Sequence, residues 1–214
     1  MDKPKFTINI NAYHDVLARF KYTTLPFAEY ILDVGSGPCL FRTIYPYTGS
    51  KITFLDMDDS DGNAFNIAKK ELSDNPDYSF ITGCSDDLSM LDDDSFDMVN
   101  FSQVFEHLTP DQIDKTMREI NRVLKTDGLL ILGTPAKEGR ILTGNYKAHP
   151  GHIEEYTHDE MLSYFTMYGF LIANRDFCLV KLEVEDDMLV ITNTIHDNPD
   201  SAYTYFYVCK KVIK

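Results

Sequence analysis

The sequence lacks several features that mark whole classes of protein. No apolar run is long enough for a signal peptide or a membrane span, and the four cysteines form no Cys-x-x-Cys pair. We therefore expect a cytoplasmic chain with buried free thiols at Cys39, Cys84, Cys178 and Cys209, rather than a redox or metal site. No internal repeat, biased tract or linker divides the 214 residues, so a single domain over 1–214 is expected.

Positive charge is also scarce. The chain has 20 lysines and arginines against 34 acids, which gives a formal net charge of -14. Such a charge repels phosphate backbones, so nucleic acid is not expected as a substrate and a small or neutral ligand is favoured. We interpret acidic clusters such as Asp92-Asp93-Asp94 as solubilising. The histidines and acids show no metal-ligand spacing, since His149 and His152 lie three apart in an expected loop, and no metal site is predicted.

The chain is organised around the stretch Ile31 to Pro38. The apolar run at 31–34 predicts a short strand buried on both faces. Gly35 and Gly37 would let the backbone turn sharply and approach a ligand, and Pro38 would open a helix. A tight turn without a ligand is the alternative interpretation of a lone Gly-x-Gly.

A second signal lies about twenty residues further along. Residues 51–55 predict another buried strand, which ends at Asp56. In a doubly wound fold an acid at this place accepts hydrogen bonds from ribose hydroxyls. A nicotinamide dinucleotide fingerprint would have a third glycine at position 40, where this chain has Leu40, so that interpretation is weakened.

The remaining pattern alternates strands with helices. Capping boxes at Thr109–Gln112 and Thr157–Glu160 each predict a helix start. Residues 136–156 show no periodicity and are expected to form a lid, while residues 1–27 are expected to form a helical cover. Further strands are expected at 78–82, 96–101, 129–132, 170–180 and 202–212, and further helices around 40–44, 65–72, 113–124 and 161–165.

Together these motifs resemble those of class I S-adenosylmethionine-dependent methyltransferases. The most specific part is the combination of Phe96–Val99, Glu106–Leu108, Glu119–Lys125 and Thr134-Pro135, within a resemblance that covers about residues 28–180. The glycine loop departs from the family, which usually has a third glycine where Cys39 stands. The resemblance implies an α/β three-layer sandwich with a doubly wound, mostly parallel seven-stranded sheet and a C-terminal antiparallel strand. It also implies S-adenosylmethionine as the donor and S-adenosylhomocysteine as the product.

The same resemblance implies the residues of the site. The cofactor-binding residues are expected to be Asp33, Gly35, Ser36, Gly37, Asp56, Met57, Ser85, Asp86, Asp87 and Ser102. On the acceptor side we predict His152 as the general base for a hydroxyl acceptor, with Glu154 or Glu155 to orient it. His107 is the second catalytic candidate, and each histidine could instead be structural or solvated.

Two functions remain open at this point. The first is a methyltransferase acting on a small-molecule or saccharide acceptor. The second is a non-catalytic S-adenosylmethionine-binding partner subunit, which Cys39 would favour if its side chain narrowed the pocket. A nicotinamide or nucleotide-sugar oxidoreductase is weaker, because no Tyr-x-x-x-Lys pair stands in the expected region. The sequence leaves the acceptor and the oligomeric state open.

Overall fold

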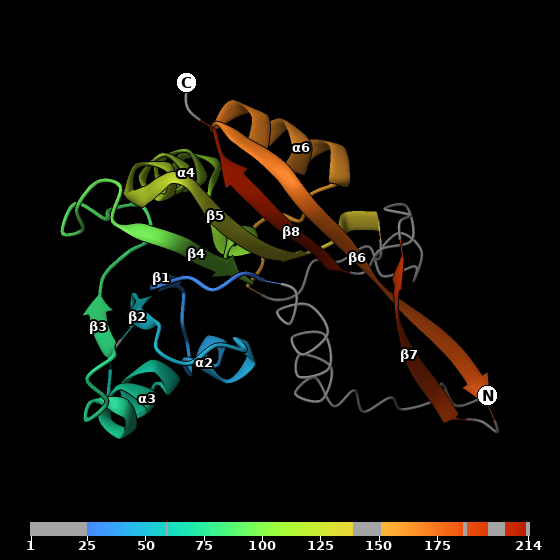
Figure 1. The fold of residues 1–214 in the computed structure, drawn as a ribbon. Helices are drawn as coiled ribbons and strands as arrows, with labels where there is room; N and C mark the ends of the chain where they lie inside the picture. The colour runs from blue at the N-terminus through green and yellow to red at the C-terminus, as the bar shows by residue number, and fades with distance from the viewer. Residues whose placement is uncertain (1–24, 59, 139–150, 186–187, 197–203, 213–214) are drawn as a thin grey trace.

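Eight strands form one sheet in the computed structural model, which describes residues 25–58, 60–138, 151–185, 188–196 and 204–212 (Figure 1). The strands are β1 (Tyr30–Val34), β2 (Lys51–Asp56), β3 (Tyr78–Thr82), β4 (Phe96–Ser102), β5 (Leu124–Pro135), β6 (Phe170–Glu185), β7 (Met188–His196) and β8 (Thr204–Lys211). Their order in space is β3-β2-β1-β4-β5-β8-β6-β7. Strands β1 to β5 pair in parallel, and β8 runs antiparallel between β5 and β6.

The predicted doubly wound sheet with a C-terminal antiparallel strand is confirmed, and β7 is an additional strand that the sequence did not predict. β7 pairs with residues Phe177–Glu185 of β6, whereas β8 pairs with residues Phe170–Cys178 of the same strand. The far half of β6 and all of β7 therefore form a two-stranded ribbon that extends away from the layers (Figure 1).

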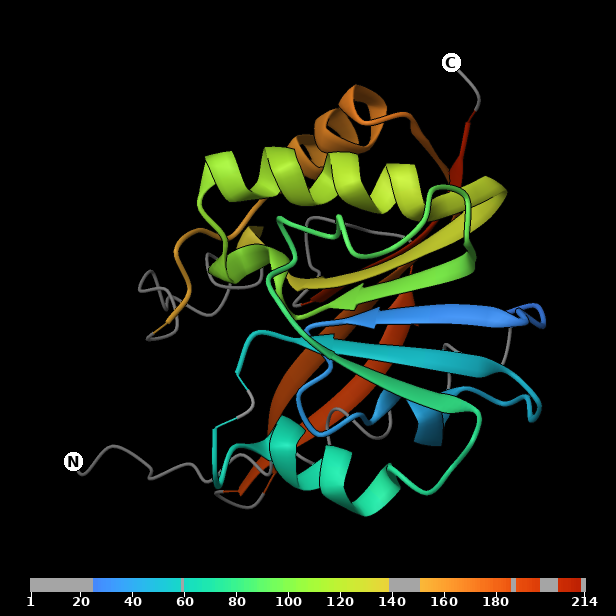
Figure 2. The same ribbon diagram turned by 90° about the vertical axis from the view of Figure 1, so that its left-hand side faces the viewer.

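Helices cover both faces of the sheet. Helices α2 (Phe41–Ile44) and α3 (Ala64–Leu72) lie on one face, and α4 (Pro110–Val123) and α6 (His158–Met167) lie on the other (Figure 2). Alternate strand residues enter the two cores, because successive side chains of a strand point to opposite faces. Ile31, Phe54 and Met98 pack with Phe41 and Phe65, whereas Leu32, Leu55 and Val99 pack with Ile113, Met117 and Phe165. The strands are thus buried on both faces, as their apolar runs predicted.

The two predicted capping boxes are confirmed. The Thr109 hydroxyl accepts the backbone N–H of Gln112 at the start of α4, and the Thr157 hydroxyl accepts that of Glu160 at the start of α6. In each box the glutamine or glutamate side chain also accepts the backbone N–H of the threonine. These reciprocal bonds satisfy amide groups that have no partner inside the helix.

The first crossover helix is shorter than predicted. It begins at Phe41 rather than Pro38 and has four residues, and Leu40 is 55% exposed instead of lying on the apolar face. The reason is the backbone of Cys39, whose φ of 55° is left-handed and interrupts a helix running on from Pro38.

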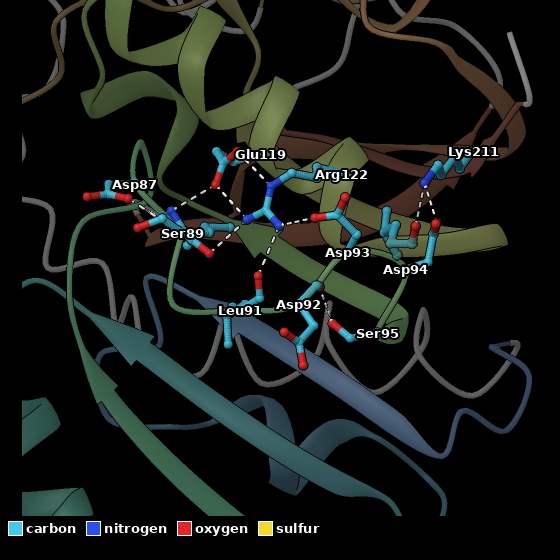
Figure 3. A network of polar contacts seen from close by, with 12 residues as sticks. Asp87, Ser89, Leu91, Asp92, Asp93, Asp94, Ser95, Glu119, Arg122 and Lys211 are labelled. Atoms are coloured by element: carbon cyan, nitrogen blue, oxygen red, sulfur yellow. Dashed lines mark hydrogen bonds and ion pairs between the residues drawn. The ribbon is translucent and has the colours of Figure 1, made fainter.

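The acidic cluster at 92–94 is part of a structural network. Arg122 of α4 bonds to Glu119 and Asp93 and donates to two backbone carbonyls of the loop 88–91 (Figure 3). Lys211 of β8 bonds to Asp94 at 2.8 Å. Interpreting these acids as solubilising alone was therefore incomplete, because two of them fasten the loop before β4 to α4 and β8.

The cysteines follow the prediction in part. Cys39 and Cys209 are buried free thiols, as expected, but Cys84 is exposed because it lies in the polar turn after β3. The side chain of Cys178, residues 1–24 of the predicted cover and residues 139–150 of the predicted lid lie outside the described residues. Within the described part of the chain, no helix combines the length and the apolar character needed to cross a membrane.

Candidate active site

The sheet changes direction of winding between β1 and β4. β2 and β3 lie on one side of β1, and β4 and β5 lie on the other. In open α/β sheets ligands bind outside the carboxyl ends of the strands at such a switch point. The ends of β1, β2 and β4 and the turns that follow them carry seven of the ten predicted cofactor-binding residues, so the topology brings these residues to one edge of the sheet.

The turn after β1 is held by backbone bonds to the next strand. The N–H groups of Gly35 and Ser36 donate to the carbonyl of Leu55 at 2.8 and 3.1 Å. Gly35 has a φ of 70°, and a Cβ there would lie 2.3 Å from Cγ2 of Val104. Gly37 has a φ of 47°, and no described atom lies within 4 Å of its Cβ position. Gly35 is therefore fixed by packing, whereas Gly37 leaves open space above the turn.

Asp56 contacts this turn directly. One carboxylate oxygen of Asp56 accepts the N–H of Gly37 at 2.8 Å, and the other accepts the N–H of Asp58 at 3.3 Å. Met57 follows it and is 73% exposed. The structure thus brings together the glycine turn and the acid at the end of the second strand, which were two separate signals in the sequence.

A buried polar chain connects the ends of β1 and β4. The amide nitrogen of Asn100 donates to Asp33 at 2.6 Å, and its oxygen accepts the Ser102 hydroxyl at 2.8 Å. The pKa of Asp33 is raised to about 7. Burial is the main cause, the charge of Asp56 adds to it, and the hydrogen bond from Asn100 opposes it. Sequence reasoning missed Asn100, although an amide inside the apolar strand 96–101 was a usable signal.

The turn after β3 lies beside this edge. The N–H of Gly83 donates to the carbonyl of Asp56 at 2.9 Å. The hydroxyls of Ser85 and Thr116 are 3.1 Å apart, and Asp87 accepts the N–H of Ser89 at 3.1 Å. Hydrogen bonds from the side chain and the backbone of Ser89 lower the pKa of Asp87. Ser85 and Asp87 are therefore engaged with the protein itself. Asp86, between them, is half-buried.

The turn after β4 is the strained part of the edge. Gln103 has a φ of 60°, which is uncommon for a residue other than glycine, and its N–H donates to the carbonyl of Gly133 at 2.7 Å. Val104 follows and packs over Gly35. Gln103 and Val104 were not among the predicted site residues, and they lead from β4 into the 3₁₀ helix η1 (Phe105–His107).

The predicted catalytic histidines lie against each other. The ring centroids of His107 and His152 are 4.8 Å apart and their planes are nearly perpendicular. Nδ1 of His107 is 2.8 Å from the carbonyl of Gly151, and Nδ1 of His152 is 2.6 Å from a carboxylate oxygen of Glu155. Glu155 rather than Glu154 orients His152, and the His152 side chain is only 12% exposed, so it is not a solvated loop histidine.

Glu106 completes this corner; it belongs to the motif Glu106–Leu108 that carries the family resemblance, but it was not among the predicted catalytic or cofactor-binding residues. Its side chain is buried and accepts the Thr134 hydroxyl at 3.2 Å, and burial raises its pKa to about 7. One ligand-type atom from each of Glu106, His107 and His152 lies within 4.8 Å of the others. We call Glu106, His107, His152 and Glu155 the histidine corner.

The two described ends of the predicted lid are joined. Ala136 and Tyr156 form a parallel β-bridge, and Lys137 pairs with Glu154 at 3.1 Å. The N–H groups of Ile153 and Glu154 donate to the carbonyl of Glu106. Residues 151–156 are therefore docked on η1 next to the site. His149 lies outside the described residues.

Cys39 does not line the open side of the glycine turn. Its side chain is fully buried in the core between the sheet and α2, with Phe41 among its neighbours. Two cavities of about 380 and 450 Å³ lie at the amino ends of the parallel strands, lined among others by Asp97 and Lys125 and by Arg118 and Lys211. Neither borders the edge at which an α/β sheet binds its ligand.

Residues 32–132 match the family model for a methyltransferase domain. No curated protein sequence matches the chain. Several solved structures share the fold, at identities that establish the fold alone. A chain of the complex between the Trm112 methyltransferase activator of Haloferax volcanii and a methyltransferase is 20% identical, with a TM-score of 0.69 over 96% of this chain and 92% of that one.

Two further structures are methyltransferases by name. An S-adenosylmethionine-dependent methyltransferase from Archaeoglobus fulgidus is 16% identical, with a TM-score of 0.65 over 94% of this chain and 93% of that one. The 1,6-didemethyltoxoflavin-N1-methyltransferase of Burkholderia thailandensis, with its substrate and S-adenosylhomocysteine bound, is 13% identical, with a TM-score of 0.63 over 100% and 94%. The domain match supports a class I S-adenosylmethionine-dependent methyltransferase, and the solved structures show that the chain has the fold of such enzymes.

Proposed function

We propose that this methyltransferase acts on a small-molecule or saccharide acceptor, and that the acceptor binds at the histidine corner. The observation that carries the proposal is the placement of His107 and His152, 4.8 Å apart, one turn beyond Val104, which packs over the glycine turn. The net charge of -14 supports a small or neutral acceptor over a polyanion.

The donor side follows from the same geometry. Asp56 is proposed to accept hydrogen bonds from the ribose hydroxyls, and Gly35, Ser36 and Gly37 to let the donor approach the backbone. The open space at Gly37 beside the Asp56 carboxylate fits such a ligand. The remaining residues proposed to surround the donor are Asp33, Met57, Ser85, Asp86, Asp87 and Ser102.

S-adenosylmethionine supplies a methyl group on a positively charged sulfur, and S-adenosylhomocysteine leaves when the carbon–sulfur electron pair stays on sulfur. For a hydroxyl acceptor the protein has to remove one proton as the new oxygen–carbon bond forms. His152 is proposed to accept this proton, and Glu155 at 2.6 Å from its Nδ1 holds the ring and stabilises its charged form. The burial of Glu155 and of most of the His152 side chain favours their alignment.

A small-molecule acceptor is consistent with a structural neighbour. The Burkholderia thailandensis enzyme is named for methylation of 1,6-didemethyltoxoflavin. The partner-subunit alternative depended on Cys39 narrowing the pocket, and the burial of this side chain in the core removes that support. The neighbour in the Trm112 complex leaves a protein partner as an additional possibility for this chain.

The test is an acceptor screen followed by comparison of variants. His152→Ala is expected to lower turnover about a hundredfold, the scale of general-base catalysis, while affinity for S-adenosylhomocysteine stays within a factor of about three. His107→Ala is expected to weaken donor and acceptor binding together. Glu154→Gln, which alters an exposed acid paired with Lys137, is the matched control and should keep full turnover. A His152→Ala enzyme with full turnover would contradict the assignment.

A further inference from the structure

We propose that Glu106, His107 and His152 bind one divalent metal ion. The three residues come from two places in the chain, the 3₁₀ helix η1 after β4 and the segment before α6. The fold nevertheless places one ligand-type atom from each within 4.8 Å of the others. Two imidazoles and one carboxylate make a ligand set that takes first-row divalent ions such as Zn²⁺, Mn²⁺ and Co²⁺.

The backbone holds the two segments together independently of the side chains. The N–H groups of Ile153 and Glu154 donate to the carbonyl of Glu106 at 2.8 and 3.3 Å. Nδ1 of His107 is in turn 2.8 Å from the carbonyl of Gly151. The segment 151–154 is thus fixed against η1 on both sides of His152, and the three side chains are preorganised.

The groups around these three residues match the outer shell of metal sites. A metal-binding histidine usually donates its other ring N–H to a carbonyl or a carboxylate, and a ligating carboxylate is itself hydrogen-bonded. Gly151 offers the carbonyl to His107, and Glu155 offers the carboxylate to His152 at 2.6 Å. The Thr134 hydroxyl donates to Glu106. With both Nδ1 atoms hydrogen-bonded, Nε2 is the favoured coordinating nitrogen of each ring.

The distances need only a small adjustment. An ion with bonds of about 2.1 Å holds tetrahedral ligands about 3.4 Å apart. One ligand-type atom of each residue, which for a histidine is either ring nitrogen, lies within 4.8 Å of the others, so side-chain rotation has to shorten those pairs by at most about 1.4 Å. Glu106 is buried, whereas His107 is exposed and His152 is partly so, which leaves the side of the ion away from the glutamate open to solvent or to a ligand.

The open side defines a class of acceptor, and this step rests on the proposed function. An ion with three protein ligands keeps positions for oxygen atoms of the acceptor, and its charge lowers the pKa of a hydroxyl. A tetrahedral ion would take one such oxygen, whereas two neighbouring hydroxyls, as in a saccharide or another vicinal diol, would fill both positions of an ion that expands to five-coordination. With the ion bound, His152 would be a ligand and the metal-bound hydroxyl would give its proton to solvent at the open side, whereas His152 is the proton acceptor only in the metal-free site.

Metal binding can be measured without an acceptor. The chelator-treated full chain is titrated with Co²⁺ and followed by visible absorption and calorimetry, and one equivalent is expected to bind. His107→Ala and His152→Ala should each reduce the affinity by more than a hundredfold. Glu155→Gln, which changes only the outer shell of His152, should reduce it about 10- to 100-fold. Glu106→Gln removes the charge of the carboxylate ligand but keeps the shape of the buried side chain. If the Glu106→Gln protein does not fold, His107→Ala tests the same site at an exposed residue.

Two further variants separate this proposal from the proposed function. Asp56→Ala should lose affinity for S-adenosylhomocysteine but keep full Co²⁺ affinity. Glu154→Gln should keep both. No saturable Co²⁺ binding by the unaltered chain, or binding that persists unchanged in both histidine variants, would overturn the metal site while leaving the methyltransferase assignment intact. Co²⁺ binding that depends on the histidines without diol methylation would instead support the site and contradict the proposed acceptor.

Discussion

Two acidic regions of the molecule are built in opposite ways. In the loop before β4, Asp93 pairs with Arg122 and Asp94 pairs with Lys211 (Figure 3). At the carboxyl ends of the strands, Asp33, Asp56 and Glu106 bond to amides and hydroxyls. Among the described residues, no lysine or arginine pairs with any of these three acids.

The acids of the first region form ion pairs that stabilise the fold, whereas those of the second lie where a ligand is expected to bind. A carboxylate beside a guanidinium is stabilised in its charged form, and the ion pair contributes to the stability of the folded state. A buried carboxylate without a cation costs free energy when it ionises, which is why the pKa values of Asp33 and Glu106 rise to about 7. Such groups are typical of functional sites, since a ligand can supply the missing partner.

The strongest test of the comparison is Asp33→Asn. Because the folded pKa of Asp33 is about 7 rather than 3.8, its contribution to stability is full below pH 4 and is lost as the pH rises to 7. Asparagine can still accept the Asn100 bond and does not ionise. Relative to the unaltered protein, the variant should therefore gain about 2–3 kcal/mol in free energy of unfolding between pH 5 and pH 8. Urea unfolding at both pH values measures this.

A control with the opposite sign is available on α4. The pKa of Asp114 is lowered by its bond to Arg118, so its stabilisation is present above pH 4 and lost at lower pH. Asp114→Asn should thus become relatively less stable as the pH rises toward 5, and between pH 5 and pH 8 its stability relative to the unaltered protein should stay constant. If the free energies of unfolding of the two variants changed with pH in the same way, the distinction between the two kinds of acid would be wrong.

The second test concerns Asp56 and donor binding. Hydrogen bonds to a charged group are worth about 1.5–3 kcal/mol each, so Asp56→Ala should weaken binding of S-adenosylhomocysteine tenfold or more in titration calorimetry. Asp61→Ala, which removes an almost fully exposed acid paired with Lys70, should leave the affinity unchanged. Unaltered affinity in the Asp56 variant would remove this residue from the donor site.

The smallest expected effect comes from the paired region. Arg122→Ala removes a guanidinium group that bonds to four residues, in a side chain that is 28% exposed. The variant should lose about 1–2 kcal/mol in free energy of unfolding and keep its affinity for the donor. On the scale of this chain that lowers the melting temperature by roughly 2–8 °C. Arg118→Ala on the same helix breaks an exposed pair and should cost less than about 0.5 kcal/mol. Loss of donor binding in Arg122→Ala would contradict the claim that the paired region affects stability alone.

The sequence predicted the features that depend on neighbouring residues. Strands buried on both faces read as apolar runs, and the capping boxes at Thr109 and Thr157 are complete within four residues. The placement of Asp56 beside the glycine turn followed from a known topology, because parallel strands end at the same edge. These predictions needed no knowledge of distant contacts.

The missed features depend on contacts between distant parts of the chain. Glu106 and His152 are far apart in sequence and meet only because 151–154 docks on η1, so spacing alone gave no metal signal. The strand β7 was hidden in an acidic connection, and its partner is the far half of β6. The short α2 depended on one backbone angle, at Cys39, which residue preferences for a left-handed φ do not favour.

The bridge between Ala136 and Tyr156 has a consequence for how this enzyme can diverge. It fixes both ends of the intervening segment to the scaffold, as does the pair Lys137–Glu154. The entropy of closing a loop grows slowly, by only about 0.6 kcal/mol for each doubling of its length. Insertions or deletions between the two anchors can therefore accumulate at little thermodynamic cost, so relatives could acquire new acceptors while the donor site stays unchanged.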